Sequence, residues 1–351
     1  MNNLSLNLKH KQKGISLIEL MISLVLGLLI VGGVIQMFIS TQHTYRTQEA
    51  MSRIQESGRY ATEVLSRNIR QAGYKGGCAR NVDVNILLNE SSADNTIHTI
   101  GEGVQGWNNN APVQYSSDMS GYVANTDVIL IKHAATASGV TASDNNNANS
   151  ASINLTGASG IPQGQIVVVA EDDACDIFQN ASNANATNLN RGNPGGLFPG
   201  NKSPASSNPF SKAYSENMRI MLFQSDLYYI GISDADPNNS SLRRIRYSAT
   251  GTATGNNEEL VDNVVDMQIR YGIDTNNDRR VNSYVPANNV SNWENVVAVR
   301  ISLLLRSEHN NILSEPISGL PFNATTFNAP ADDRRMYQAF TTTVGIRNKL
   351  P

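Results

Sequence analysis

Residues 15–39 form an uninterrupted apolar run of 25 residues with a single charged side chain, Glu19. As a helix rising about 1.5 Å per residue, the run would be roughly 37 Å long, enough to cross the hydrocarbon core of a bilayer with some tilt. Lys9, Lys11 and Lys13 precede the run, and no lysine or arginine follows it closely. This distribution of charge predicts a cytoplasmic N-terminus and places the rest of the chain outside the membrane.

The run differs from a secretory signal peptide. Such a signal has a shorter apolar region, about 7 to 15 residues, and a small-residue cleavage site, whereas this run is followed by STQHTY, which offers no such site. A plain membrane anchor fits the length but gives no reason for Glu19. A carboxylate at membrane depth costs on the order of 2.5–3.5 kcal/mol on insertion scales. Glu19 therefore needs either a partner or an interfacial position from which its side chain reaches the headgroups.

The helical pattern continues beyond the apolar run. No proline occurs between residues 40 and 72, and apolar or small residues recur there at steps of three and four, on one helical face: Ile54, Gly58, Ala61, Leu65, Ile69 and Ala72. Gly73, Gly76 and Gly77 then end the helix. A single rod over residues 15–72 would be about 87 Å long. We expect its outer half to pack on the sheet that follows; a free coiled coil is the alternative use of this pattern.

After residue 77 the sequence changes to short apolar and β-branched runs bounded by turn residues. These runs predict strands at residues 126–132, 164–170, 242–247, 260–273, 296–307 and 339–348, and two strands within 221–232, separated at Ser225 and Asp226. In 296–307 one face carries only apolar residues and the other carries Arg300, Ser302 and Arg306, so this strand should bury one face. The expected fold class is α+β, a long helix packed on a mostly antiparallel β head.

Two stretches rich in Asn, Ser and Gly interrupt the strands, at residues 134–160 and 178–217. We expect both to be surface loops, since loops of this length are often functional or disordered. The chain accordingly divides into a leader (1–14), an apolar helix (15–39), an amphipathic helix (40–73) and a head (74–351).

Cys78 and Cys175 are the two cysteines of the chain. In an exported chain such a pair is predicted to form a disulfide, and buried free thiols are the alternative. The bond would close a loop of about 100 residues, worth up to roughly 4.7 kcal/mol in the chain-entropy model. The formal net charge of −3 gives no electrostatic reason to bind nucleic acid.

Gly14, followed by ISLIELMISLVLGLLIVGG and preceded by a basic leader, resembles the class III signal of type IV pilins and pseudopilins. The matching positions are Gly14, Leu17, Ile18, Glu19 and Leu20. The resemblance implies that a prepilin peptidase cuts between Gly14 and Ile15, that Ile15 is then N-methylated, and that Glu19 serves assembly. Ile15 stands where phenylalanine is usual, at a position that tolerates other apolar residues.

A role of Glu19 in assembly has a physical basis. Cleavage would expose a positively charged α-amine at Ile15, and the amine of one subunit could offset the cost of Glu19 on its neighbour. A pair in low dielectric adds little net stability, but a missing partner is strongly penalised. Glu19 would therefore fix the axial register between helices. The alternative is an interfacial glutamate that reaches the headgroups.

Stretches further along the chain narrow the resemblance to the PilW family of minor pilins. In order, they are GYKGGC (73–78), CDIFQ (175–179), YYI (228–230), LRR (242–244), ELVDNVVDMQIRYGIDTNNDRRVNSY, WENVVAVRISLLLRS and TTTVGIRNK. The resemblance implies a low-abundance, non-catalytic subunit that moves from the inner membrane into the pilus and primes assembly in a tip complex. Implied partners are major and minor pilins, the prepilin peptidase, the assembly platform and a tip adhesin. The rivals are a minor pseudopilin of a type II secretion system and a membrane-anchored adhesin.

One loop has the ligand types of a calcium site. Asp274, Asn276, Asp278 and Asn282 stand at positions 1, 3, 5 and 9 of a calcium-loop pattern, and oxygen ligands at alternate positions suit a hard cation. However, Arg279 replaces the glycine of that pattern and Val285 replaces its glutamate. A calcium site and a plain Asn/Asp-rich connection between strands both remain open, and we expect no other cofactor.

Other patterns give little support for catalysis or nucleic-acid binding. Gly101, Gly103 and Gly106 match G-x-G-x-x-G, but WNNNAP follows where a dinucleotide site needs a helix N-terminus. The five histidines lack metal-ligand spacing, and no G-x-S-x-G elbow occurs. A basic cluster, Arg243, Arg244 and Arg246, could contact phosphate; a solvated strand face or a contact with another subunit is the more common role of such a cluster.

Overall fold

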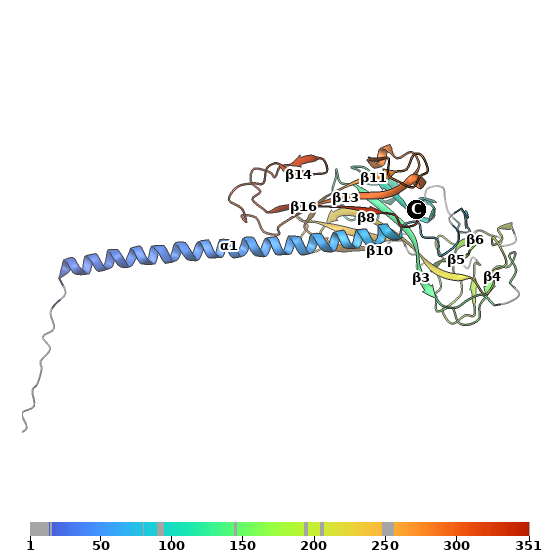
Figure 1. The fold of residues 1–351 in the computed structure, drawn as a ribbon. Coiled ribbons are helices and arrows are strands. Elements are labelled where there is room, and N and C mark those ends of the chain that lie inside the picture. Colours follow the sequence, from blue (N-terminus) through green and yellow to red (C-terminus); the bar gives the residue numbers. More distant parts are fainter. Residues whose placement is uncertain are drawn as a thin grey trace, which may run out of the picture.

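The computed structural model describes residues 14, 16–79, 81–89, 95–143, 146–192, 196–203, 207–247 and 256–350. Its first element, α1 (Leu17–Gln71), is a continuous helix of 55 residues, about 82 Å long at 1.5 Å per residue. The first half of α1 projects away from the rest of the molecule, and the second half lies along a β head (Figure 1). The leader and Ile15 lie outside the described residues.

The second half of α1 buries the face that its periodicity predicts. Ile54 is 3% exposed, Ala61, Leu65, Ile69 and Ala72 are fully buried, and Gly58 is buried as well. A Cβ built on Gly58 would lie 2.3 Å from the Phe340 ring, so glycine is required for this close approach of helix and sheet. The prediction that this half packs on the sheet is confirmed, and the free coiled coil is excluded.

The end of α1 is fixed by a glycine turn and by backbone bonds to the head. Gly73 has a φ of 70°, in the left-handed region that favours glycine. Its N–H donates to the Lys132 carbonyl (2.8 Å), which anchors the turn to a strand of the head, and the Tyr74 N–H donates to the Gln71 carbonyl (3.0 Å). The chain therefore leaves the helix in one defined direction.

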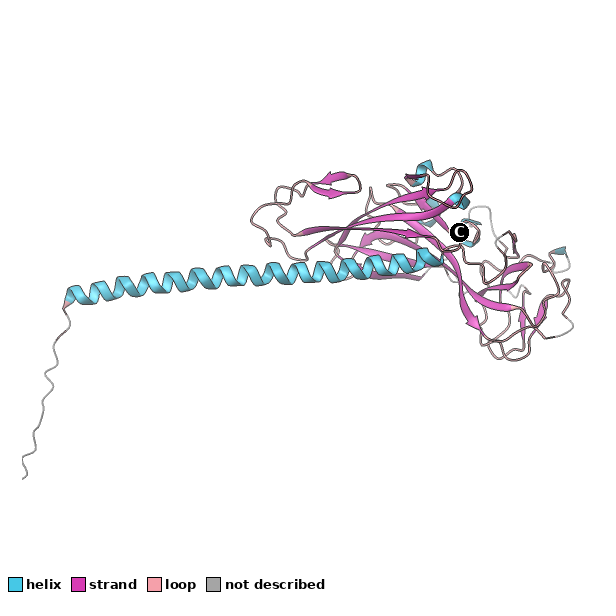
Figure 2. Ribbon diagram, in the orientation of Figure 1, coloured by secondary structure: helices cyan, strands magenta, loops and turns pink. Residues whose placement is uncertain are grey.

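Within the described residues, the larger of two main sheets has eight strands, shown with the others in magenta in Figure 2. Its order is β1, β6, β5, β8, β3, β2; β9 pairs with the second half of β8, and β10 pairs with β9. The β1–β6 pair is parallel and the others are antiparallel. The bounds are β1 Val84–Ile86, β2 Val104–Trp107, β3 Val128–Ser138, β5 Ile166–Glu171, β6 Ala174–Gln179, β8 Arg219–Ile232, β9 Ser240–Arg246 and β10 Asn256–Asp262.

The second main sheet is antiparallel, in the order β12 (Ser283–Val285), β11 (Val264–Ile273), β13 (Val296–Arg306), β16 (Tyr337–Gly345). Its inner face, the inner face of the larger sheet and the buried face of α1 share one core, to which Leu65, Tyr228 and Ile301 belong. The α+β fold class, a long helix on a mostly antiparallel head, is confirmed.

Two strands refine the sequence predictions. The break predicted at Ser225 and Asp226 is wrong, because β8 runs unbroken over 14 residues and buries both side chains. In β13, Val299, Ile301, Leu303 and Leu305 face the main core as predicted. Its other face is partly covered, since Leu304 packs with Phe322 and Tyr337. Phe322 belongs to a hairpin, β14 (Leu320–Phe322) and β15 (Thr325–Phe327), inserted between β13 and β16.

The Asn/Ser-rich stretches contribute to a second core. Short strands β4 (Ser152–Asn154) and β7 (Asn188–Asn190) pair with each other. Their few apolar side chains pack with aromatic residues against β5 and β6; this core includes Ile153, Val169, Phe178, Leu189, Phe210 and Tyr214. The predicted surface loops therefore contain a small packed layer. Short helical turns complete the described fold, at α2 (Asn95–His98), Val113–Tyr115, Ala287–Asn289 and Trp293–Asn295.

Candidate assembly site on the N-terminal helix

The first half of α1 presents a continuous apolar surface. The large apolar side chains from Leu17 to Ile39 are 52–78% exposed, and the first core residue of α1 is Ile54. Among the described residues, α1 is the helix long and apolar enough to cross a membrane, with a mean hydropathy of 2.6 over its most apolar window. Soluble monomers rarely expose an apolar patch of this size. Lipid or the helices of other proteins must therefore cover this surface.

Glu19 lies in the first turn of α1. Ser16 is the N-cap, and its carbonyl accepts the N–H groups of Glu19 and Leu20 at 3.0 Å each. The Glu19 carboxylate is exposed and has no hydrogen bond or ion pair with any residue that the structure describes. The partial positive charge of a helix N-terminus favours a carboxylate here. Among the described residues, the favourable influence on this charge is therefore the helix dipole.

The predicted cleavage point lies just before the helix. Gly14 is exposed, and a Cβ built on it would meet no atom within 4 Å. Ile15, the other side of the bond, is outside the described residues. Gly14 and Glu19 thus lie just before and within the first turn of α1, whose first half projects away from the head (Figure 1), and the roles of Gly14, Ile15 and Glu19 remain predictions.

The head holds the other end of α1 through contacts that sequence patterns did not indicate. Arg53 of α1 forms ion pairs with Glu49 (3.0 Å) and with Glu308 of the head (3.6 Å). The Asn348 amide donates to the Ala72 carbonyl (3.2 Å), and the Arg347 N–H donates to the Arg70 carbonyl (3.2 Å). Polar residues after a last strand carry no sequence signal for such a role.

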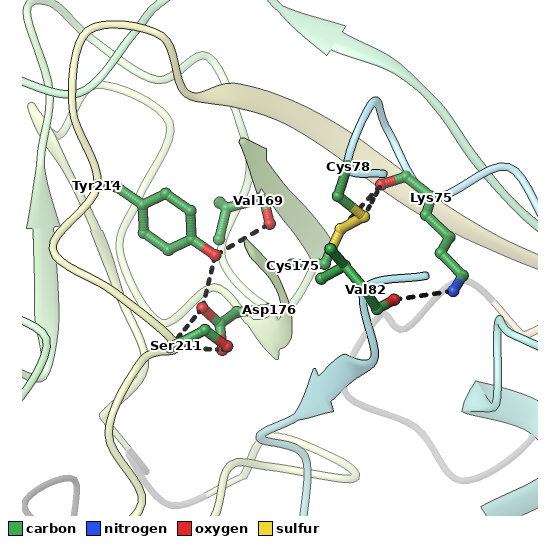
Figure 3. Close-up of a disulfide and its surroundings, with 8 residues drawn as sticks. All are labelled: Lys75, Cys78, Val82, Val169, Cys175, Asp176, Ser211 and Tyr214. Carbon is green, nitrogen blue, oxygen red and sulfur yellow. Dashed lines mark hydrogen bonds between the residues drawn. A yellow bond between two sulfur atoms is a disulfide. The ribbon is translucent and has the colours of Figure 1, made fainter. Parts of the chain in front are cut away.

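The Cys78–Cys175 disulfide is confirmed. It joins the segment after the glycine turn to β6, with Cα atoms 6.1 Å apart (Figure 3). Both sulfur atoms lie near the Lys75 carbonyl oxygen, at 3.4 and 3.6 Å; these are contacts and not hydrogen bonds, because a disulfide sulfur carries no hydrogen. The bond fixes the second core to the exit of the helix.

Beside the disulfide, a buried carboxylate organises the second core. Asp176 accepts hydrogen bonds from the Tyr214 hydroxyl (2.6 Å) and the Ser211 N–H (2.9 Å), as Figure 3 shows. Burial raises the pKa of Asp176, and these bonds act in the opposite direction. Asp176 thus links β6 to an Asn/Ser-rich stretch expected to be a surface loop.

The candidate calcium loop is held by its own side chains. Asp274 accepts the N–H groups of Asn276 (3.1 Å) and Arg279 (2.7 Å), and Asn282 accepts that of Thr275 (2.7 Å). Burial alone would raise the pKa of Asp274, but these backbone bonds hold it below its ordinary value. Within the described part of the chain, no three His, Cys, Asp or Glu side chains group to hold a metal ion. Calcium therefore stays a prediction.

The basic cluster is part of the head's own ion-pair network. Arg243 is 4% exposed and pairs with Asp234 (2.9 Å) and Glu259 (3.2 Å). Arg246 pairs with Asp226 at 3.3 Å, and Arg244 pairs with Glu258 and Asp226. The expectation of a solvated strand face is wrong for Arg243, which is buried, and carboxylates of neighbouring segments pair with all three arginines within the chain. A contact of this cluster with another subunit stays a prediction.

Two glycines of the G-x-G-x-x-G pattern, Gly103 and Gly106, serve packing. Gly103 has a φ of 71°, and a Cβ built on it would lie 2.8 Å from the Gly73 nitrogen. A Cβ on Gly106 would lie 1.9 Å from the Tyr271 hydroxyl. Close approach of neighbouring segments, and not nucleotide binding, accounts for the last two glycines of this pattern.

Two family models match the chain. A prokaryotic N-terminal methylation motif matches residues 9–35, which include Gly14, Glu19 and the start of α1. The model for type IV pilus-assembly protein W, PilW, matches residues 227–348, from within β8 to the residues that cap α1. These two matches support a PilW-like pilin. No curated protein and no solved structure shows a significant match to it.

The two matched regions correspond to two parts of the fold, the start of α1 and the second main sheet of the head. The methylation motif covers the exposed apolar end of α1, and the PilW region supplies the sheet β12–β11–β13–β16. This PilW-like pilin is associated with the type IV pilus as a minor pilin and is structural in character. Through α1 it is anchored in the inner membrane before assembly into the pilus.

Proposed function

We propose that the PilW-like pilin primes or supports type IV pilus assembly within a complex at the filament tip. Its signal is cut between Gly14 and Ile15 by a prepilin peptidase, and Ile15 is then methylated. Its partners are the major and other minor pilins, the inner-membrane assembly platform and a tip adhesin. The match to pilus-assembly protein W supports this proposal and favours it over the pseudopilin of a secretion system.

The observation that carries the proposal is the exposed apolar half of α1 with one unpaired carboxylate in its first turn. A lipid-facing anchor needs only an apolar surface. A helix that leaves the bilayer to pack with other helices also needs a device for axial register, which an unpaired acid and a neighbour's α-amine provide.

Mass spectrometry of the mature N-terminus tests the proposal. We expect the native protein to begin at a methylated Ile15, and Gly14→Ala to leave the leader uncut. Gly27→Ala is the matched control, since a Cβ on Gly27 also meets nothing within 4 Å. A native chain that keeps residues 1–14, or normal cutting of Gly14→Ala, would refute it.

For the loop that begins at Asp274 we retain the proposal of a calcium site. Its proposed ligands are Asp274, Asn276, Asp278 and Asn282, and its support is that hydrogen bonds hold these side chains in one loop, with the Asn276 amide donating to the Asp278 carboxylate at 3.2 Å and Asn282 accepting the Thr275 N–H at 2.7 Å. The test is thermal unfolding with calcium and with a chelator. A midpoint that falls on chelation in the wild type, but not in Asp278→Ala, is the expected result; equal midpoints would refute it.

A further inference from the structure

We propose that a cavity beside the end of α1 binds an anionic oxygen group, a carboxylate or a phosphate. The cavity has a volume of about 310 Å³, at the lower end of the range for small-ligand sites. Its wall is formed by the glycine turn after α1, by Gly101, by the loop that begins at Asp274, and by the chain end at Asn348 and Lys349.

The charge of the cavity is one-sided. Lys75, Arg279 and Lys349 line it, and none of its described lining residues is acidic. The three cations come from three segments that are far apart in the sequence, so the fold itself gathers them. The Lys75 ammonium donates to the Val82 carbonyl at 3.0 Å, so it contributes charge to the cavity and is held in place by the fold. Like charges in proximity disfavour one another's charged forms, and an anion between them would reduce this cost.

The end of α1 does not account for these cations. Cations often satisfy the last carbonyls of a helix. Here the carbonyls of Gln71 and Ala72 already accept bonds from the Tyr74 N–H (3.0 Å) and the Asn348 amide (3.2 Å). The Lys349 ammonium instead donates to the carbonyl of Gly101, another residue that lines the cavity, at 3.1 Å.

Lys349 has no carboxylate partner in ion-pair contact among the residues described. Burial lowers its pKa, and the charge of Lys75 lowers it further, while Glu294 and Glu102 act in the opposite direction. An anion in the cavity would replace part of the solvation that Lys349 loses on burial.

Arg279 is presented to the cavity by the loop that resembles a calcium site. Its φ of 64° lies in the left-handed region, and its N–H donates to the Asp274 carboxylate at 2.7 Å. Its guanidinium makes no hydrogen bond or ion pair with the described residues, whereas guanidinium is well suited to two-point binding of carboxylate or phosphate. Asp274 is thus a positioning residue for Arg279.

Titration calorimetry of the full mature chain in a non-ionic detergent and a low-chloride buffer tests the site, with inorganic phosphate and glutarate as probes. We expect Arg279→Gln and Lys349→Gln each to weaken binding about tenfold or more. Arg280→Gln is the matched control, because Arg280 is an exposed neighbour that does not line the cavity. No binding of either probe, or an equal loss in the control, would overturn the proposal. Since Arg279 is exposed, its variant remains informative if Lys349→Gln fails to fold.

A second arm identifies the source of the anion in cells. If an acidic side chain of another pilin occupies the cavity, Arg279→Glu should reduce incorporation into pili, and Arg280→Glu should not. If a free anion occupies it, incorporation should be unchanged while Arg279→Glu still abolishes probe binding. The calorimetric arm does not depend on pilus assembly, so its failure and a failure of the proposed function are separate results.

Discussion

Glu19 is a charged residue in the most apolar part of the chain, and its position in the first turn of α1 compensates for little of that charge. Its place in the first turn gives it about 0.3–1 kcal/mol from the helix dipole, against on the order of 2.5–3.5 kcal/mol for a carboxylate at membrane depth. The dipole therefore covers only part of the cost. The remainder has to come from water and headgroups at the interface or, on the proposed assembly role, from a positive group on another subunit.

We accordingly predict that Glu19→Gln is processed normally but enters pili at least about tenfold less often, because an uncompensated charge on the neighbour costs several kcal/mol. Glu56→Gln, an exposed change elsewhere on α1, should have no effect. The measurement is an immunoblot of sheared pili against the membrane fraction, with the leader monitored by size. Equal incorporation of wild type and Glu19→Gln would remove the register role.

Asp266 is a second carboxyl group whose charged form is disfavoured by its surroundings. Burial raises its pKa to about 6; a bond from Gln268 opposes the shift, and the charge of Asp127 adds to it. Asp127 itself joins the two main sheets, since its carboxylate accepts the N–H of Ile269 at 2.7 Å. Two carboxylates thus share the junction between the sheets.

The contribution of Asp266 to the stability of the head should therefore become less favourable as the pH rises from about 4 to about 6. The pKa of Asp266 is higher in the folded than in the unfolded chain, so the folded state binds more protons in this window. Thermal unfolding of wild type and Asp266→Asn measures this effect. We expect the variant to be the more stable at pH 7 and its advantage to shrink towards pH 4; a difference independent of pH would contradict the assignment.

At the scale of elements, α1 is divided by what covers it. Its first half depends on an external apolar environment, whereas its second half is covered by β13, β16 and the larger sheet. Gly58 marks the closest approach, because the Phe340 ring occupies the space of a side chain there. The head can therefore pack against α1 in only one rotational orientation of the helix, the one in which Gly58 faces Phe340.

Gly58→Leu should destabilise the head by about 1–3 kcal/mol or more, the usual cost of overpacking, although leucine is a much better helix former than glycine. Denaturant unfolding followed by tryptophan fluorescence measures the loss. Gly33→Leu is the control, since nothing lies within 4 Å of a Cβ there. Adding Phe340→Ala should recover part of the loss, and no recovery would mean that the Phe340 ring is not the cause.

Periodicity explains why some elements could be predicted and others could not. The buried face of α1 and the core face of β13 repeat over many residues, so their patterns are unambiguous. The polar pair Ser225 and Asp226 was predicted to interrupt the strand, because adjacent polar residues usually mark turns. In the structure β8 continues through both residues, since it pairs with β3 on one side and with β9 and the residue after it on the other. The contact between Asn348 and the end of α1, and the group of three cations around the cavity, had no local sequence signal. Only the tertiary fold brings these residues together.

At the scale of the whole molecule, the disulfide ties two cores of different character. The first core is dense in aliphatic residues from α1 and both sheets, whereas the second is built from sparse apolar residues among Asn and Ser. Such spacing looks like a loop in the sequence, which is why this layer escaped prediction. Its stability rests more heavily on the bond at Cys175 and on the buried Asp176.

Removing the disulfide with Cys78→Ser/Cys175→Ser should therefore loosen the second core selectively, at a cost of about 2–5 kcal/mol. Hydrogen exchange should rise in β5 and β6 and stay low in β11. Wild type under non-reducing conditions is the reference. Equal changes in β6 and β11 would show that the two cores unfold as one unit.

The pairing of α1 with β16 has a consequence for how the protein is made. The helix cannot complete the burial of its inner face until the strand at Tyr337–Gly345 has been translated and translocated, nearly three hundred residues after Ile54. During synthesis the emerging polypeptide waits on the periplasmic side with its packing face uncovered, within reach of chaperones and proteases. A product terminated before that strand would be anchored in the membrane without a complete core. Proteolysis would then remove it before it enters a growing fibre.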